Sequence, residues 1–307
     1  MFDGIDELVL PTHSIDPLLD LYVDIMGFTV LDDESVHGPD WQQIWHLPLP
    51  PDRIVTLRKP NSHGGGIRLV SVPGLPAAAP AVRPDRIGPY ALDFFLRDPD
   101  AVEARMDVAG WAFRSPAVHY HLPGTDIDVR ERMLCQTNSG LLHALVQHRP
   151  RGTRCVLGHD ESEVVSEVAT AVFLTDRFTE ATAFARDVLG AEEYFTGRFD
   201  GPAVERMLDL APGEGLETAL FRGPRSHNAR LEFAEILPGS DEVSGMTPRV
   251  IATIAVTDLD ALHRALADGA HGPVVGPRTI GGRRHVGLAS RYGAMFDFVD
   301  RVSEAGT

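Results

Sequence analysis

Residues 58–70, RKPNSHGGGIRLV, align without a gap with residues 222–234, RGPRSHNARLEFA, at a constant offset of 164 residues. Both segments place a Ser-His turn before an apolar run of the kind that forms a β-strand. The same pairing sets a helix-period segment that ends at Gly27 beside another that ends at Gly190. The second half of the chain therefore repeats the first.

A second pair of matches relates the inner quarters of the chain. Residues 97–102 (RDPDAV) match residues 257–262 (TDLDAL), and residues 139–146 (SGLLHALV) match residues 292–299 (YGAMFDFV). Because all the matches keep one order along the chain, they indicate duplication rather than chance. The second quarter thus corresponds to the fourth, as the first corresponds to the third.

Each quarter has the pattern of a strand, a helix that stops at a glycine, and three further strands. Asp98 and Asp258 stand where a helix N-cap is expected, because a short carboxylate can accept from the first free backbone N–H groups. The alternation over residues 91–96 predicts that Leu92, Phe94 and Leu96 face the helices. Ala91, Asp93 and Phe95 should then face a cavity.

Four βαβββ units predict an α+β fold with two domains, residues 1–148 and 162–303. Each domain should hold two units that close a curved sheet into an open barrel around a cavity, with the helices outside. Runs rich in Pro, Gly, Ala or Ser at 73–89 and 237–247 would join the units within each half, and residues 148–161 would join the halves.

Composition limits the class of protein. Hydrophobic residues make up 43% of the 307 residues, as in an ordinary globular protein. With 28 Lys and Arg against 44 Asp and Glu, the net charge of −16 disfavours nucleic acid and anionic membrane partners. No membrane span or signal peptide is visible, and two cysteines make no disulfide framework. We expect a cytoplasmic protein that binds a small molecule; a homodimer is an assembly that the sequence allows.

The order of elements and four tags, LDLYVDIMGF, FARDVLGAE, VTDLDALHRALADGA and SRYGAMFDFVD, resemble the vicinal oxygen chelate superfamily. That superfamily includes glyoxalase I, bleomycin-resistance proteins, fosfomycin-resistance enzymes and extradiol dioxygenases. The resemblance covers nearly the whole chain and implies the fold, but it leaves the chemistry open, since both enzymes and binding proteins share this fold.

The resemblance also implies where a metal would bind, because metal-using members take His, Glu or Gln ligands from the first and last strands of a unit. The corresponding positions in this chain carry no histidine and too few carboxylates in either half. They are Glu7, Arg68, Ala91 and Ala144 in the first half, and Thr170, Glu232, Ile251 and Asp297 in the second. We therefore expect no metal ligands, no transition metal and no other cofactor.

The second half is the expected working half, because Glu232 and Asp297 would share its cavity with no cation at the equivalent positions. Thr170, Ile251 and Thr253 would line that cavity. In the first half Glu7 and Arg68 could form an ion pair or anchor a ligand, and Asp93 could contact one. Trp41 and Trp45 would serve as core or as a lid.

Three functions fit these residues. The first is a protein that binds a small, aromatic or carbonyl-bearing molecule without a catalytic metal. The second is an enzyme, a lyase or isomerase, that uses Glu232 and Asp297 as acid and base. The third is a metal-dependent enzyme of the dioxygenase or glyoxalase type, with those carboxylates as ligands.

Overall fold

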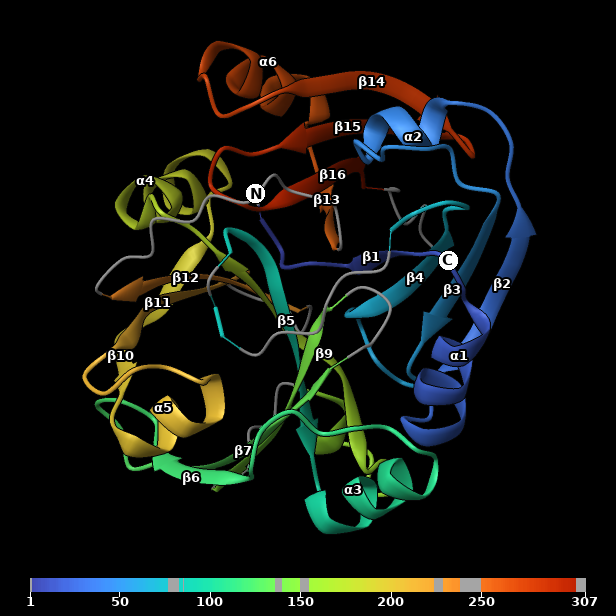
Figure 1. Ribbon diagram of the computed structural model, residues 1–307. Coiled ribbons are helices and arrows are strands. Elements are labelled where there is room, and N and C mark those ends of the chain that lie inside the picture. Colours follow the sequence, from blue (N-terminus) through green and yellow to red (C-terminus); the bar gives the residue numbers. More distant parts are fainter. Residues whose placement is uncertain are drawn as a thin grey trace.

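The computed structural model describes residues 2–76, 83–84, 86–135, 140–149, 155–223, 229–237 and 250–301. His227 of the repeated Ser-His turn, most of the run 237–247 and the last two residues of the second expected domain lie outside these ranges. Within them the chain forms the four expected βαβββ units, coloured in chain order in Figure 1.

The first and second units lie in residues 7–149. Their elements are β1 (Glu7–Thr12), α1 (Asp16–Leu19) continued by a π-helical segment (Asp20–Ile25), β2 (Thr29–Ser35), α2 (Asp40–Ile44), β3 (Arg53–Arg58), β4 (Gly66–Ser71), β5 (Gly88–Leu96), α3 (Pro99–Val108), β6 (Val118–His121), β7 (Asp128–Cys135) and β8 (Leu142–Arg149).

The third and fourth units follow a single 3₁₀ turn, Val156–Gly158. Their elements are β9 (Val165–Leu174), α4 (Phe178–Ala183) continued by a π-helical segment (Phe184–Val188), β10 (Glu192–Asp200), α5 (Pro202–Leu208), β11 (Gly215–Arg222), β12 (Arg230–Leu237), β13 (Ile251–Val256), α6 (Leu259–Asp268), β14 (Val274–Ile280), β15 (Arg283–Ala289) and β16 (Met295–Asp300).

Local sequence explains where the helices begin and end. The Asp98 carboxylate accepts from Ala101 N at 3.1 Å, and the Asp258 carboxylate accepts from Ala261 N at 2.9 Å, so both predicted N-caps are confirmed. Gly27 follows the first helix with a φ of 76°, a conformation that costs glycine little. No helix of the described segments is long and apolar enough to cross a membrane.

The pairing of units differs from the expectation. One eight-stranded sheet has the order β14-β15-β16-β13-β1-β4-β3-β2 and joins the fourth unit to the first. The other has the order β10-β11-β12-β9-β5-β8-β7-β6 and joins the third unit to the second. We call them the β1–β13 sheet and the β5–β9 sheet after their central antiparallel seams, visible at the centre of Figure 1.

The expectation that residues 1–148 and 162–303 each close their own barrel is therefore wrong, since each sheet takes one unit from each half. The seam consists of backbone hydrogen bonds between first strands, and all four first strands are mostly apolar. Sequence similarity among the units cannot decide which first strands meet, because every choice buries comparable side chains.

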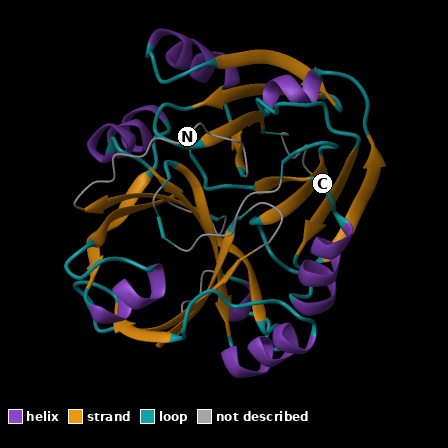
Figure 2. Ribbon diagram, in the orientation of Figure 1, coloured by secondary structure: helices purple, strands orange, loops and turns teal. Residues whose placement is uncertain are grey.

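Buried side chains divide by the face of the sheet that they occupy. The helix-facing sides of both sheets share one continuous core, which includes Leu92, Phe94 and Leu96 as predicted. Each concave face has a separate cluster, and Ala91 and Phe95 belong to that of the β5–β9 sheet. Figure 2 shows the helices at the periphery of the strands, as the superfamily resemblance implies.

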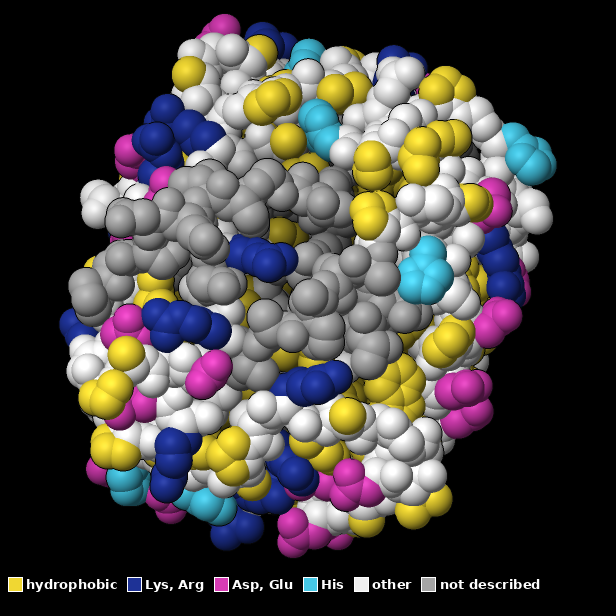
Figure 3. Space-filling model, viewed as in Figure 1, with side chains coloured by type: hydrophobic (Ala, Val, Ile, Leu, Met, Phe, Trp, Pro, Cys, Tyr) yellow, Lys and Arg dark blue, Asp and Glu magenta, His cyan; other side chains and the backbone are white. Residues whose placement is uncertain are grey.

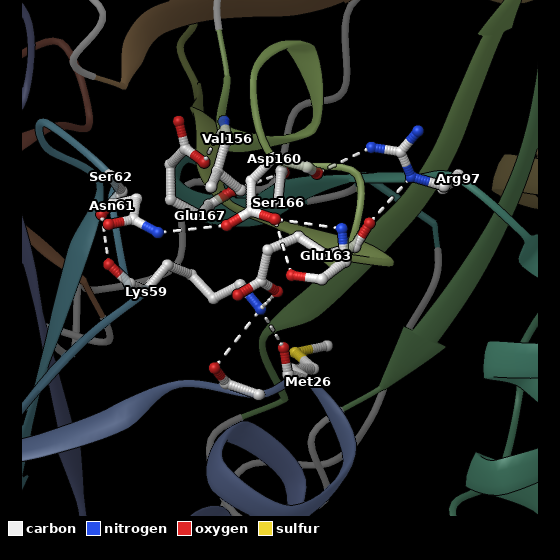
Figure 4. Close-up of polar contacts among 12 residues, drawn as sticks. Met26, Lys59, Asn61, Ser62, Arg97, Val156, Asp160, Glu163, Ser166 and Glu167 are labelled. Atoms are coloured by element: carbon white, nitrogen blue, oxygen red, sulfur yellow. Dashed lines mark hydrogen bonds and ion pairs between the residues drawn. The ribbon is translucent and has the colours of Figure 1, made fainter.

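A buried lysine ties the first unit to the segment that leads into β9 (Figure 4). Lys59 is only 2% exposed; its Nζ forms an ion pair with Glu163 and donates to Met26 O at 2.7 Å. Nearby, Arg97 Nη2 donates to the carbonyls of Leu157 and Asp160, both at 2.9 Å. The Lys59–Glu163 ion pair thus connects the β1–β13 sheet to the segment that leads into β9, whereas the Arg97 bonds join the end of β5 to the turn before β9 within the other sheet.

Candidate functional site

The concave face of the β5–β9 sheet encloses a cavity of about 360 Å³, which we call the β5–β9 cavity. Its wall is mostly apolar and aromatic, and α5 covers one side through Val204, Met207 and Leu208. Aromatic side chains come from several strands: Tyr90, Phe95, Tyr120, Tyr194, Phe195 and Phe199. A cavity of this size and character is typical of a small-molecule site.

Three carboxyl groups enter this cavity, Asp93 from β5, Glu131 from β7 and Glu232 from β12. Each has a hydroxyl partner. The Tyr120 hydroxyl donates to Glu131, the Thr218 hydroxyl donates to Glu232 Oε1 at 2.5 Å, and Thr170 hydrogen-bonds to Asp93.

Burial raises the pKa of all three groups, because the charged form loses hydration. The pKa of Glu131 rises to about 7. The pKa of Glu232 also rises to about 7, mainly through burial, and the charge of Glu131 contributes. Burial, and then the charge of Glu232, lifts the pKa of Asp93 well above its usual range. Near neutral pH the cluster therefore holds protons that it can donate.

A cation lies in the same cavity. The Arg230 guanidinium carbon is 5.4 Å from the centre of the Phe95 ring and 5.6 Å from that of Tyr194. The charge of Arg230 lowers the pKa of Asp93 and Glu232, although no carboxylate of the described residues lies at ion-pair distance from it. The buried Tyr194 hydroxyl lies beside this guanidinium without an aligned hydrogen bond. His148 packs on Phe95 at 4.8 Å, and burial lowers its pKa to about 4, so it is neutral.

The concave face of the β1–β13 sheet is filled by two tryptophans. Trp41 in α2 and Trp45 directly after it stack with ring centres 4.2 Å apart, and Trp45 is fully buried. Trp45 Nε1 donates to Asp297 Oδ2 at 3.0 Å, and His285 Nδ1 lies 2.9 Å from Asp297 Oδ1. Arg68 lies over Trp41 and forms the expected ion pair with Glu7 at 2.5 Å. The tryptophans thus form the core of this barrel.

The two barrels differ at one position in the sheet beneath the covering helix. The 164-residue offset places α2 on residues 204–208, within α5, so these helices are equivalent. Gly287 pairs with Asp297, and Met133 pairs with Ala144 at the equivalent point of the other sheet. A Cβ on Gly287 would lie 2.0 Å from the carbonyl oxygen of Ile44. Glycine lets α2 reach its sheet, whereas Met133 at the equivalent point lines the β5–β9 cavity together with residues of α5.

The structure divides the residues predicted for each half of the chain between the two sheets. Thr170, Glu232 and Asp93 face the β5–β9 cavity. The other predicted residues all belong to the β1–β13 sheet: Glu7, Arg68, Ile251, Thr253 and Asp297. The prediction that Glu232 and Asp297 share a cavity is wrong, because the halves do not form separate barrels. Asp297 is not short of donors either, since Trp45 and His285 surround it.

Sequence reasoning missed Glu131, Arg230, Tyr120 and Tyr194. It considered first and last strands only, whereas Glu131 lies on β7, a middle strand. The signal for Glu131 was its alternation with Val129 and Met133, which puts a carboxylate on an apolar face. Arg230 was detectable as the residue two positions before Glu232, on the same side of β12.

The donors present do not fit the metal site that the fold family implies. At the expected strand positions the β5–β9 sheet offers Ala91, Ala144, Thr170 and Glu232, of which one is a carboxylate and none is a histidine. Asp93 and Glu131 bring two carboxyl groups into the cavity from other positions. Within the described residues no three His, Cys, Asp or Glu side chains are grouped for a metal ion. The functions proposed for this cavity use no metal, and the absence of a bound metal stays a prediction.

No protein-family model matches this sequence, and no curated protein matches it. Solved structures do match. Glyoxalase I from Zea mays superposes with a TM-score of 0.62 at 13% identity, over 97% of this chain and 92% of that chain. A Bacillus subtilis protein provisionally named a dioxygenase superposes with a TM-score of 0.60 at 12% identity, over 97% of this chain and 85% of that one. At these identities the likeness concerns the fold alone, and the chain shares the tandem βαβββ fold of glyoxalase I.

Proposed function

We propose that the protein binds a small, mostly apolar molecule with an aromatic ring or a carbonyl group in the β5–β9 cavity. The observation that carries this proposal is an aromatic-walled cavity of about 360 Å³ that also holds buried titratable groups. Apolar walls supply affinity and a few polar groups fix orientation, as in most small-molecule sites. The tryptophan-filled β1–β13 barrel has a structural role in this proposal.

The size of the cavity suits a ring system of one or two rings. Burying about 250 Å² of ligand surface, at about 25 cal/mol per Å², contributes on the order of 6 kcal/mol before the costs of association. Without any cost of association this would correspond to a Kd of about 40 μM, so a bicyclic ligand without optimised polar contacts should bind more weakly than that.

A titration with 2-acetylnaphthalene tests the proposal, because this probe has both a bicyclic ring and a carbonyl. Binding is measured by calorimetry or by ligand-observed NMR. Ala91→Leu fills the cavity and should weaken binding at least ~10-fold. Glu217→Gln, a change on the helix-facing side of β11, should leave it unaltered. Equal affinity for the native protein and a folded Ala91→Leu variant would exclude the cavity as the site.

A second candidate function is proton transfer, favoured by the pKa of about 7 for both Glu131 and Glu232. A carboxyl group that titrates near neutral pH can accept and return a proton during catalysis. We propose Glu232 as the acid–base residue of a lyase or isomerase. Its partner in this proposal is Glu131, and not Asp297 as the sequence suggested. The test is NMR measurement of deuterium exchange into the methyl group of 2-acetylnaphthalene. If the native protein promotes this exchange no faster than the Glu232→Gln variant, the proposed proton transfer is rejected.

We also propose that this binding occurs in the cytoplasm and involves neither nucleic acid nor membranes. The exclusion of nucleic acid and membranes rests on the net charge of −16 and on the distribution of charges, and the cytoplasmic location rests on two cysteines that form no disulfide framework. On the face shown in Figure 3, Lys and Arg side chains are interspersed with Asp and Glu and form no single basic patch. A shift assay with duplex DNA and sedimentation with anionic vesicles should both be negative.

A further inference from the structure

The polar groups of the β5–β9 cavity differ in whether they have partners. The acceptor groups have donors, because Glu131, Glu232 and Asp93 each have a hydroxyl neighbour. Two donor groups of the cavity lack a comparable acceptor. Within the described residues Arg230 has no carboxylate at ion-pair distance, although its charge lowers the pKa of Asp93 and Glu232, and the buried Tyr194 hydroxyl lies beside Arg230 without an aligned hydrogen bond.

These two donors are held together and in place. Arg230 leads β12 and Tyr194 lies on β10, and both side chains line the cavity. The Phe95 and Tyr194 rings flank the guanidinium, and such packing fixes a planar fork of N–H groups without consuming any of them. A buried hydroxyl without a partner, such as that of Tyr194, is costly, so a molecule that supplies an acceptor here is stabilised by this hydroxyl and by the half-buried Arg230 guanidinium.

We propose that the ligand of the β5–β9 cavity is an aromatic molecule with a carboxylate, enolate or similar oxyanion, and that Arg230 and Tyr194 bind this oxygen. The inference rests on the proposed function, which it makes more specific. Guanidinium groups bind planar oxyanions through two parallel hydrogen bonds, and a neighbouring hydroxyl adds a third.

The alternative ligand is a cation that pairs with the carboxyl groups. The partners described above favour the anion, because each carboxyl already accepts from a hydroxyl group. Burial also raises the pKa of Glu131 and Glu232 to about 7, so at pH 6 both are mostly neutral and do not repel an anion.

The titratable groups that face this cavity together determine its net charge. By strand they are Tyr90 and Asp93 on β5, Tyr120 on β6, Glu131 on β7, His148 on β8, Tyr194 on β10, and Arg230 and Glu232 on β12. His148 is neutral at pH 6, since its pKa is about 4, so Arg230 is the cation of this set.

Three probes with one ring system test the inference: 2-naphthoate, 2-naphthylmethanol and 2-naphthylmethylammonium. Affinities are measured at pH 6 by calorimetry on the full chain. We expect 2-naphthoate to bind ~10-fold or more tightly than the alcohol, as a charge-assisted hydrogen bond implies. Arg230→Gln should abolish that advantage, and Tyr194→Phe should reduce it about 3-fold. Glu217→Gln is the control, and thermal melts verify that each variant folds.

The outcomes separate the inference from the proposed function. Tightest binding by the ammonium probe, or equal binding by all three, overturns the oxyanion inference and leaves the cavity as a binding site. An unchanged preference for 2-naphthoate in a folded Arg230→Gln variant overturns it as well. Failure of all three probes to bind the native protein contradicts the proposed function itself.

Discussion

Replacing Glu131 by glutamine should make the protein more resistant to unfolding at alkaline pH than the native chain. Glu131 is 8% exposed, and burial raises its pKa from 4.5 to about 7 in the folded state. Between these values the native state binds more protons than the unfolded state, so stability falls as the pH rises. Below pH 4.5 both states are protonated, and this contribution disappears.

The magnitude follows from the shift. Each pKa unit corresponds to about 1.4 kcal/mol, so the shift from 4.5 to about 7 costs the native protein about 3 kcal/mol at pH 8 relative to pH 4. Glutamine cannot ionise, and its amide oxygen can still accept from Tyr120. The free energy of unfolding of Glu131→Gln minus that of the native protein should therefore increase by about 3 kcal/mol between pH 4 and pH 8.

Urea unfolding followed by circular dichroism at pH 4, 6 and 8 measures this difference. Glu217→Gln serves as the control, because Glu217 lies on the helix-facing side of β11 and is partly exposed. Its difference from the native protein should stay constant with pH to within ~0.5 kcal/mol. A difference for Glu131→Gln that does not change between pH 4 and pH 8 would refute the argument that this carboxyl is protonated in the folded protein.

Three further changes test the packing. Trp45→Ala should cost about 3–5 kcal/mol in urea unfolding, because it empties the core of the β1–β13 barrel; Trp45→Phe should lose less. Gly287→Ala should displace α2, since its Cβ would meet Ile44 O, and the tryptophan emission should shift to the red with no loss of binding in the β5–β9 cavity. Lys59→Ala should cost about 3–5 kcal/mol by leaving Glu163 without its partner. A double Lys59→Met, Glu163→Met variant should cost less than the two single changes added together.

Local signals in the sequence predicted most of the fold. The repeat at an offset of 164 identified four units, and the alternation over residues 91–96 placed Asp93 on a cavity face. Both are short-range patterns, and the structure follows them. The pairing of units was not predictable in the same way, because it depends on backbone bonds between strands that are far apart in the chain and similar in composition.

The candidate site was only partly predicted, because it too depends on the pairing of units. Thr170 and Glu232 reach the cavity, but the residues that complete it come from the second unit rather than the fourth. Comparison of α2 with α5 could have shown which barrel is filled. At the 164-residue offset Asp209 is the equivalent of Trp45. The bulky side chain that fills the β1–β13 barrel therefore has no counterpart in the other barrel.

The order of the strands also determines the order in which the two barrels can be completed during synthesis. All strands of the β5–β9 sheet lie between residues 88 and 237, in two consecutive units, so its cavity can close before the fourth unit leaves the ribosome. The β1–β13 sheet needs β1, made first, to pair with β13 some 240 residues later in the chain. Until then the edge of β1 has unpaired backbone groups that a strand of another chain can join. If the fourth unit is synthesised slowly, the nascent first unit is therefore exposed to aggregation for longer, whereas the ligand cavity is already closed.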